Sequence, residues 1–504
     1  MVVQHNMQAM NANRMLNVTT SAQSKSTEKL SSGYKINRAA DDAAGLTISE
    51  KMRKQIRGLD QASTNAQDGV SSVQTAEGAL TEVHSMLQRM NELATQAANG
   101  TNSKDSDRQA IQDEIDQLTT EIDRVSETTK FNETYLLKGE AGTKTINMKA
   151  HDAGLKGTLT DNGDGTATFV MDTLNAGDKV SIGGKQYTIG GKAADVTAAF
   201  GANGLNIDTN HQDVSVNGTT YKWYADTVKT KDNKGISAGY YSQDPSTLAD
   251  QAAATATSVG GVATTSAATL AANAPHGSTI TVGSKSVTLM QDDGAKGGTA
   301  NDEIDDVDST VISKTKAYEL ASKELLAANQ IGDTKGNATV TKADGTTKLD
   351  ATNGDGTFKI KVGQAEVANS LSFSLHVGAD ADMTNKIQVN IDAMDSASLG
   401  IKGLNVKDAS GNAATYAVDA ISDAISKVSS QRSSLGAVQN RLEHTINNLD
   451  NVVENTTTAE SRIRDTDMAE EMVNYSKNNI LAQAGQSMLA QANQSNQGVL
   501  SLLQ

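Results

Sequence analysis

The 504-residue sequence has no cysteine, only 2 prolines, and aromatic residues at only 3% of its positions. The absence of cysteine excludes disulfides, thiolate metal sites and cysteine nucleophiles, so packing alone must stabilise the fold. No run of about 18 apolar residues occurs, which is the length that a membrane-spanning helix needs. We therefore expect neither a redox-active thiol nor a membrane partner.

Positive charge is also in short supply. The chain has 44 Lys and Arg against 60 Asp and Glu, a net charge of −16. This charge repels nucleic acid and anionic membranes, so nucleic acid is not expected as a partner. The first residues contain neither a basic segment before an apolar core nor a small-residue cleavage site. If the protein is exported, we expect a route without a cleaved signal peptide.

Glycine and proline divide the chain into three regions. Of the 42 glycines, residues 1–140 hold 7, residues 396–504 hold 6, and the middle holds 29. Both prolines, Pro245 and Pro275, also lie in the middle. The two ends of the chain therefore lack the residues that most often break helices.

Both ends have apolar residues at coiled-coil spacing. From Ile48 to Ala97, these residues are separated only by threes and fours, which predicts a long helix with one seam. The segment "NGTNSKDS" is a turn, and a second, antiparallel helix follows, in which Ser106 and Gln109 fit a capping box. A third stripe near the other end of the chain has the same spacing. A helix this long needs partners, so the two ends are predicted to pack as one helical bundle.

The middle region has strand and hairpin patterns. "VSVNGTTYKWYA" places Asn217 and Gly218 between alternating segments, which is the signal of a type I′ hairpin. "DKVSIGGKQYTIG", "GSTITVGSKSVTLM" and "GTFKIKVGQAEV" alternate about a glycine turn, whereas "SKTKAYELASKELLAAN" is helical. The predicted fold class is mainly α: a coiled-coil helical bundle core built from both chain ends, with an inserted β-rich (α+β) outer lobe.

The sequence contains few candidates for catalysis. No two of the 7 histidines have the i, i+4 spacing of paired zinc ligands. "DNGDGT" at 161 and "TNGDGT" at 352 lack the terminal glutamate of a calcium loop, and Asx and glycine turns explain them better. We interpret Asp41 and Asp42 as residues near a helix start, where the helix dipole favours negative charge, rather than as an acid–base pair. With no phosphate-binding loop or nucleophile elbow, we expect no enzyme, no metal and no cofactor.

One surface patch is a candidate for binding. Arg89 and Leu93 are four residues apart and project roughly a quarter turn away from the seam. An arginine beside an off-seam leucine is a candidate patch, and a singly exposed leucine without a function is the alternative.

The extreme ends share an uncharged, amphipathic composition. "SMLAQANQSNQGVLSLLQ" closes the chain with no charged side chain, and residues 1–24 contain only Arg14 as a fixed charge. Alone, the tail fits a helix on its own core or an amphipathic membrane segment, but the flanking cations of the latter are missing. We predict that both ends are assembly elements that fold completely only beside a neighbouring subunit. The residues expected to mediate self-assembly are Met7, Met10, Leu481, Met488, Leu489, Val499, Leu500 and Leu503.

Three segments resemble bacterial flagellin, the subunit of the flagellar filament. They are "EKLSSGYKINRAADDAAGLTISEKMRKQIRGLDQASTNAQDGVSSVQTAEGAL" (28–80), "SSLGAVQNRLEHTINNL" (433–449) and "NILAQAGQSMLAQANQSNQGVLSLL" (479–503). The resemblance implies three domains: a terminal helical domain lining the filament channel, a helical filament core, and a variable outer region facing solvent. Their expected bounds are 1–45 with 456–504, 46–150 with 395–455, and 151–394.

The resemblance also implies partners and a location. It implies export through the flagellar type III apparatus, a chaperone that holds the carboxy-terminal segment, a cap protein, hook-junction proteins, and an extracellular place in the flagellum. It further implies recognition by the innate immune Toll-like receptor 5 through "LQRMNELATQAANGT" and the helix after it. The family's contact residues correspond to Arg89, Leu93 and Glu114.

The leading hypothesis is therefore a structural subunit that polymerises into a helical filament. Two alternatives are a monomeric surface adhesin, with the outer lobe as its recognition module, and a flagellar hook-filament junction protein. An enzyme within the insert has no support, because the H-E-x-x-H motif of a metallopeptidase is missing.

Overall fold

The computed structural model describes most of the chain and divides it into two compact units. The described residues are 6–99, 106–201, 212–249, 251–256, 258, 267–292, 302–342, 344–345, 356–408 and 411–501. The first unit comprises Met1–Thr75, Ser372–Asn390 and Ser434–Gln504, and the second comprises Ala76–Leu371 and Ile391–Ser433.

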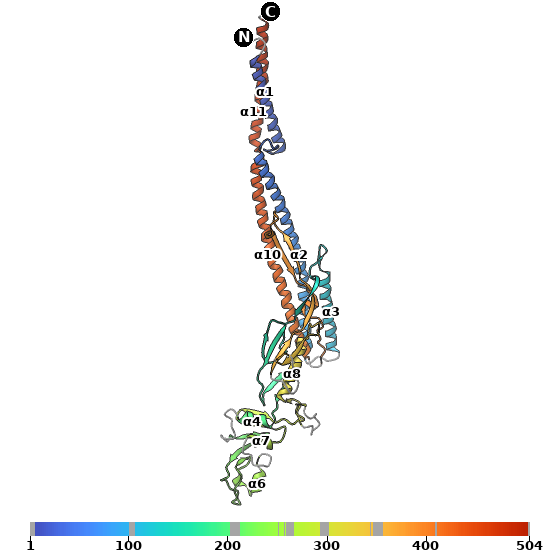
Figure 1. The fold of residues 1–504 in the computed structure, drawn as a ribbon, viewed down its shortest axis with the longest axis vertical. Coiled ribbons are helices and arrows are strands. Elements are labelled where there is room, and N and C mark those ends of the chain that lie inside the picture. Colours follow the sequence, from blue (N-terminus) through green and yellow to red (C-terminus); the bar gives the residue numbers. More distant parts are fainter. Residues whose placement is uncertain are drawn as a thin grey trace. The chain divides into compact units, whose positions relative to one another are not determined.

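Long helices come from both ends of the chain (Figure 1). They are α1 (Met7–Ser32), α2 (Ala43–Ala98), α3 (Asp107–Thr128), α10 (Asn412–Arg464) and α11 (Met468–Ser501). Short helices are α4 (Ala193–Gly201), α6 (Gln251–Ala256), α7 (Ala267–Asn273), α8 (Lys314–Asn329), α9 (Ser396–Leu399), η1 (Pro245–Thr247) and η3 (Met383–Asn385).

Local sequence sets where α1 begins and ends. The Asn6 side chain accepts a hydrogen bond from the Ala9 amide at 2.9 Å and so caps the first turn. Gly33 ends the helix at φ +76°, a left-handed conformation that glycine adopts without a Cβ penalty. The Asp42 carboxylate then accepts from the Ala44 and Gly45 amides at the start of α2, which confirms its predicted helix-start role.

The terminal helices α1 and α11 pair in antiparallel fashion within the first unit. Near one end the Asn6 amide nitrogen donates to the Ala492 carbonyl at 3.0 Å. Toward the other end Lys29 Nζ lies 3.8 Å from Glu471 Oε2. Residues close to opposite ends of the chain therefore lie side by side along the whole of α1.

The seam of α2 is buried over most of its length, as its spacing predicts. Its buried members are Ala62, Ala66, Val73, Ala76, Leu80, Val83, Leu87, Met90, Ala94 and Ala97. The helix α10 faces it in both units: Ser63 Oγ donates to Asp450 at 3.1 Å in the first, and Arg432 Nη2 donates to Glu77 at 3.3 Å in the second. Ile48, which begins the predicted seam, is exposed.

The predicted capping box at the start of α3 is not formed. Ser106 is the residue before the helix, but its side chain makes no capping bond and donates to Asp107 instead. Gln109 donates to Asp113 one turn further along. The carboxylates of Asp107 and Asp113 thus accept hydrogen bonds from the two side chains that a capping box would use as acceptors for backbone amides, and the serine and glutamine spacing does not reveal this.

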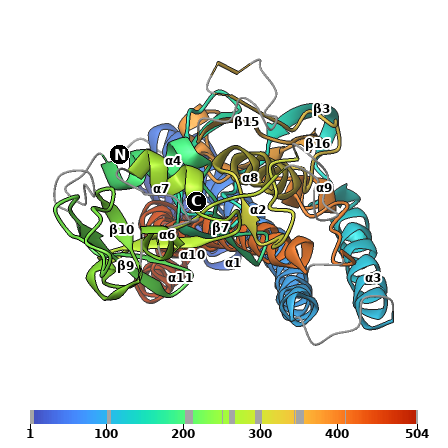
Figure 2. The same cartoon turned by 90° about the horizontal axis from the view of Figure 1, so that it is seen from below.

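The middle of the chain forms small sheets in the second unit. Its strands are β1 (Lys130–Phe131), β2 (Thr134–Tyr135), β3 (Glu140–Asn147), β4 (Gly157–Asp161), β5 (Thr166–Met171), β6 (Lys179–Ile182), β7 (Lys185–Ile189), β8 (Val214–Val216), β9 (Thr219–Tyr224), β10 (Gly239–Tyr241), β11 (Thr279–Val282), β12 (Lys285–Thr288), β13 (Val311–Ile312), β14 (Thr339–Lys342), β15 (Thr357–Lys361) and β16 (Gln364–Asn369). Their sheet orders are β14-β15-β5-β4, β13-β7-β6, β10-β9-β8-β11-β12, β16-β3 and β1-β2. Figure 2 shows this insert from below, with α4 and α7 next to one another.

The two largest apolar cores among the described residues of the insert are separate from one another. One packs α8 onto the sheets that contain Phe169, Phe358 and Ile189. The other packs α4 and α7 onto the five-stranded sheet around Ile280. The predicted fold class, a helical core from both chain ends with an inserted β-rich lobe, is confirmed.

Asn and Gly residues between strands correctly predict one hairpin turn, but the hairpin predicted about Gly363 is wrong. Asn217 and Gly218 both have positive φ between the antiparallel strands β8 and β9, as a type I′ turn requires. In "GTFKIKVGQAEV", by contrast, the strands before and after Gly363 belong to different sheets, since β15 pairs with β5 and β16 pairs with β3. The predicted Asx turn at 161 is present, with the Asp161 carboxylate accepting from the Gly163 amide, whereas residues 352–355 lie outside the described part of the chain.

The expected outer region 151–394 is divided between the two units. The strands β17 (Leu371–His376) and β18 (Lys386–Ile391) form their own two-stranded sheet. Val377 and Ile387 pack against Ala66 of α2 and Leu442 of α10 in one cluster of the first unit. The stretch Ser372–Asn390 thus belongs with the helices of the first unit.

Candidate assembly and recognition surfaces

The terminal helices carry exposed apolar side chains in large number. These side chains are between 47% and 71% exposed. They are Met7, Met10, Met15 and Val18 on α1, and Met468, Met472, Val473, Ile480, Leu481 and Met488 on α11. We call this set the terminal apolar surface. Surface methionines and leucines are common singly, but a gathered set on two paired helices marks an interaction surface.

Two parts of the terminal apolar surface are continuous, open helix faces. On α11, the face contains Met472, Val473, Ile480 and Leu481 together with Ser476 and Lys477. On α1, the face contains Met10 and Val18 together with Asn13, Arg14, Asn17 and Ser21. We call them the α11 face and the α1 face, and each is open for another helix to pack against it.

Four of the eight residues predicted for self-assembly belong to this surface. Met7, Met10, Leu481 and Met488 are exposed, and Leu489 is half-buried. Leu503 lies outside the described residues, as do the side chains of Val499 and Leu500.

Sequence reasoning missed several members of the surface. Met472, Val473 and Ile480 were not among the predicted residues, although they are as exposed as those that were. Their signal was present in "EEMVNYSKNNIL", where apolar residues recur at helical spacing among polar ones.

A cluster around Tyr34 ties the segment after α1 to the helices of the first unit. The Arg464 and Arg53 guanidinium carbons lie 4.9 Å and 5.8 Å from the centre of the Tyr34 ring. Arg464 also donates to Glu50 at 2.6 Å, and this hydrogen bond holds the pKa of the Glu50 carboxyl below its ordinary value. Lys35 donates its amide hydrogen to the Arg464 carbonyl at 2.6 Å. We call this set the Tyr34 cluster.

The predicted recognition patch is only partly exposed. Arg89 Nε donates to Glu114 Oε1 at 2.9 Å across α2 and α3, and Arg89 Nη1 donates to Glu92 at 3.2 Å. These hydrogen bonds raise the pKa of Arg89, so its guanidinium is charged at any physiological pH. Both Arg89 and Glu114 are exposed at their side chains.

Leu93 does not project into solvent, contrary to the prediction. Its side chain is only 2% exposed. Leu93 lies one turn after Arg89 on the same face of α2, and Arg89 reaches α3, so this face is turned toward α3. The seam of α2 is therefore not its only buried stripe, because Leu93 lies outside the seam and is buried as well.

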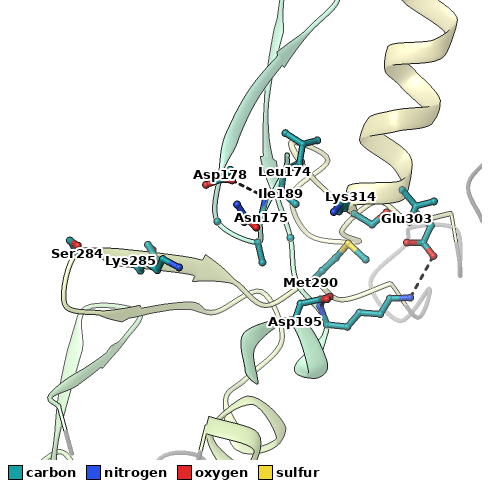
Figure 3. A pocket seen from close by; sticks show the side chains of 17 residues that line it. Leu174, Asn175, Asp178, Ile189, Asp195, Ser284, Lys285, Met290, Glu303 and Lys314 are labelled. Atoms are coloured by element: carbon teal, nitrogen blue, oxygen red, sulfur yellow. Dashed lines mark hydrogen bonds and ion pairs between the residues drawn. The ribbon is translucent and has the colours of Figure 1, made fainter. Parts of the chain in front are cut away.

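A pocket of about 710 Å³ opens in the insert between strands of its two cores (Figure 3). Its lining includes Asp178, Asp195, Lys285 and Lys314, and Lys192 Nζ lies 3.5 Å from Glu303 Oε1 at its edge. The Asp178 and Asp195 carboxylates accept hydrogen bonds from the backbone of Asn175 and Lys192. The two carboxylates therefore stabilise local turns. No hydrogen bond between a nucleophile and a base is found among the residues that line the pocket.

The described residues contain neither a metal-ligand cluster nor a membrane-spanning helix. Among them, no set of three or more His, Asp and Glu side chains is gathered as metal ligands. None of the described helices combines the length and hydropathy that spanning a bilayer requires.

The fold and its surfaces define a class of proteins. In this class, long helices from the two chain ends pair with one another, and a β-rich region is inserted between them in the sequence. Residues 3–142 match the model of the bacterial flagellin N-terminal helical region, and residues 418–503 match that of the C-terminal helical region. The chain belongs to the bacterial flagellin family.

Full-length relatives agree with this assignment. A flagellin of Clostridium tyrobutyricum is 37% identical over 502 residues, covering 99% of this chain and 100% of the relative. A flagellin of Bacillus subtilis (strain 168) is 34% identical over 504 residues, with 100% of each chain covered. A flagellin of Salmonella rubislaw is 35% identical over 502 residues, covering 97% and 96%. Membership of this structural-protein family supports a role as a self-polymerising flagellar filament subunit rather than as an enzyme.

Proposed function

We propose that the chain polymerises into the flagellar filament through its terminal apolar surface, which identical copies cover in the assembled state. The observation that carries this proposal is the gathering of ten exposed apolar side chains on α1 and α11. Burying one such side chain completely is worth roughly 1.5–3 kcal/mol relative to leaving it in water. Repeated at every subunit, head-to-tail contacts of this kind generate an open helical polymer.

The direct test is assembly of the purified full-length chain. At rising protein concentration, we expect a sharp onset of sedimenting material that negative-stain microscopy shows as long filaments. A chain that stays monomeric and fibre-free at every concentration, even with preformed filament ends added, would contradict the proposal.

The adhesin alternative is separated by removing the insert. The Met148 amide donates to the Gly363 carbonyl at 2.8 Å, so the chain can be closed there by a short glycine linker replacing residues 149–362. A filament subunit retains assembly without these residues, since α1, α2, α10 and α11 remain. An adhesin loses its main activity instead, and a hook-filament junction protein would fail to form long filaments with or without the insert.

Export details form a further part of the proposal. We expect passage through the flagellar type III apparatus without a cleaved signal peptide, with a chaperone on the carboxy-terminal segment, assembly beneath a cap protein and attachment to hook-junction proteins. The uncharged amphipathic ends support this view, because such helices need a partner before they reach their site of assembly. The mass of the exported protein should equal that of the complete chain, and a shortened amino terminus would contradict an uncleaved signal.

We also propose that Toll-like receptor 5 binds at Arg89 and Glu114. Their exposed ion pair joins α2 to α3 and presents one cation and one carboxylate to a partner. Leu93, being buried one turn after Arg89, has a different part in this proposal: it stabilises the stretch of α2 that carries Arg89. Its effect on the receptor would therefore be indirect.

A receptor-reporter assay tests these residues with a matched control. Arg89→Ala and Glu114→Ala should each weaken activation, whereas Arg124→Ala should not, although Arg124 also forms an exposed pair with Glu121 on α3. Leu93→Ala should lower both thermal stability and activation. Unchanged activation by both Arg89→Ala and Glu114→Ala would discard the site.

A further inference from the structure

Methionine is concentrated where the assembly surface lies. Of the 15 methionines, 7 fall in residues 1–24 and 468–488, and the chain has no cysteine, so thioethers are its only sulphur groups. Within the described residues, Met7, Met10, Met15, Met468, Met472 and Met488 are between 49% and 71% exposed. We call these six the surface methionines of the terminal helices.

The methionines elsewhere differ in exposure. Met90, Met148, Met171, Met290 and Met394 are buried to 9% exposure or less. Met383 is 75% exposed, but it lies in the short helix η3 (Met383–Asn385), apart from the terminal apolar surface. Among the described residues, methionine is thus buried at five positions, half-buried at Met52 and Met86, exposed outside the surface at Met383, and exposed within it at six positions.

We propose that the surface methionines of the terminal helices are an oxidation site that controls polymerisation. The oxidant is a peroxide: its O–O bond breaks, the thioether sulphur takes up one oxygen as a sulfoxide, and the peroxide is reduced to water or an alcohol. The inference rests on the proposed polymerisation through the same surface.

Chemistry explains why the sulfoxide blocks assembly. A methionine thioether is apolar and adapts its shape to the helix it packs against, whereas its sulfoxide is polar and must be desolvated before it can be buried. Met472 belongs to the α11 face and Met10 to the α1 face, so sulfoxides form on the two faces against which a neighbouring helix would pack. The α1–α11 pair itself need not open, because the oxidised side chains face solvent in the single chain.

Accessibility gives the modification a direction. In the free chain the six thioethers are open to a small oxidant, whereas the neighbouring copies of a filament would cover them. The free subunit is therefore sensitive, and the assembled subunit is protected. Reduction by a methionine sulfoxide reductase restores the thioether and with it the ability to assemble.

The test treats full-length monomer and preformed filament with hydrogen peroxide and maps sulfoxides by peptide mass spectrometry. We expect the six surface methionines and Met383 to be oxidised in the monomer, and the six to be protected in the filament. After oxidation, the critical concentration for assembly should rise at least about tenfold, which corresponds to about 1.4 kcal/mol. Treatment with the reductase should reverse the rise.

Two variants separate the surface from general damage. Replacing the six surface methionines with leucine keeps an apolar side chain of similar volume, so this variant should assemble before and after peroxide treatment. Met383→Leu, the matched control, should lose assembly on oxidation as the wild type does.

Three outcomes would overturn the inference: no sulfoxide at the six positions of the monomer, unchanged assembly of oxidised wild type, or equal peroxide sensitivity in the six-leucine variant. If that variant fails to assemble before treatment, two measurements on the wild type still test the inference. They are the recovery of assembly after reductase treatment and the protection of the six methionines in the filament. An untreated wild type that never assembles would contradict the proposed function itself, which distinguishes the two failures.

Discussion

The long helix α2 and the terminal helices α1 and α11 all carry apolar side chains among polar ones, but these side chains are mostly buried on α2 and largely exposed on α1 and α11. Along α2, the side chains from Ala62 to Ala97 at seam positions are buried, with α10 contributing a partner in each unit. Along α1 and α11, ten apolar side chains remain exposed although the two helices pair with one another. Two helices cover only one side of each other, so a pair leaves apolar area that a larger bundle would bury.

This difference teaches that apolar spacing identifies an interface but not the chain that completes it. For α2 the partner is within the same chain, and the seam contributes to the stability of the folded monomer. For α1 and α11 we propose that the partner is another copy, so the same kind of side chain contributes to assembly. Substitutions on the α2 seam should therefore lower the stability of the monomer, whereas substitutions on α1 and α11 should weaken assembly.

The largest effect is expected from a charge on the terminal apolar surface. Val473→Asp places a carboxylate on the α11 face, and burying it at every subunit contact should abolish filament formation. Unfolding of the monomer should change by no more than about 0.5 kcal/mol, since Val473 is 67% exposed. Sedimentation and microscopy measure the first effect, and thermal unfolding measures the second.

Val307→Asp is the matched control for this prediction. Val307 is 57% exposed but lies in the insert, outside the terminal apolar surface. It should assemble normally. Equal losses of assembly in the two variants would show that added charge alone, rather than its position, prevents polymerisation.

A smaller effect on stability distinguishes a seam leucine from a surface leucine. Leu87→Ala removes a completely buried side chain and should lower the free energy of unfolding by about 2–5 kcal/mol. Leu481→Ala, on the exposed face of α11, should cost at most about 0.5 kcal/mol of monomer stability while weakening assembly. Denaturant unfolding measures the free energy of unfolding of both variants. Similar losses of stability in the two would contradict the proposed difference between the regions.

The Tyr34 cluster should contribute less than the seam. Arg464→Met removes the guanidinium from the Tyr34 ring and from Glu50, and should lower the stability of the first unit by about 1 kcal/mol. Arg14→Met, on the exposed face of α1, is the control and should leave unfolding unchanged. Hydrogen exchange around residues 29–42 locates the change. A loss confined to other segments would contradict a role in anchoring the end of α1.

The smallest effect is a pH dependence of the same cluster. The hydrogen bond from Arg464 lowers the pKa of Glu50 below its ordinary value of 4.5, so the carboxylate favours the folded state. This contribution is complete above pH 4.5 and is lost as pH falls through the lowered pKa. The stability difference between wild type and Arg464→Met should therefore shrink under acid conditions. A difference that stays constant through this range would exclude the Glu50 contact as its source.

The sequence predicts the elements whose signals are local. The seam of α2, the type I′ turn at Asn217 and the start of α2 at Asp42 each depend on residues a few positions apart, and the structure has all three. Long-range partners are harder to foresee. The strands on either side of Gly363 join different sheets, a choice made by residues about two hundred positions away.

The recognition patch shows the same limit. The seam spacing of α2 describes one stripe, and Leu93 lies outside that stripe. Its burial shows that neighbouring residues cover a second side of the helix, and a single period cannot reveal how many neighbours a helix has. Arg89 and Glu114, as charged residues, stay at the surface in either case.

Hydrogen exchange of the monomer and the filament, compared residue by residue, tests the central claim most directly. If α1 and α11 are assembly elements, the amides of 7–32 and 468–501 exchange readily in the monomer and become strongly protected in the filament, whereas the α2 seam is protected in both. Complete protection of α1 and α11 already in the monomer, with no gain on assembly, would contradict the account.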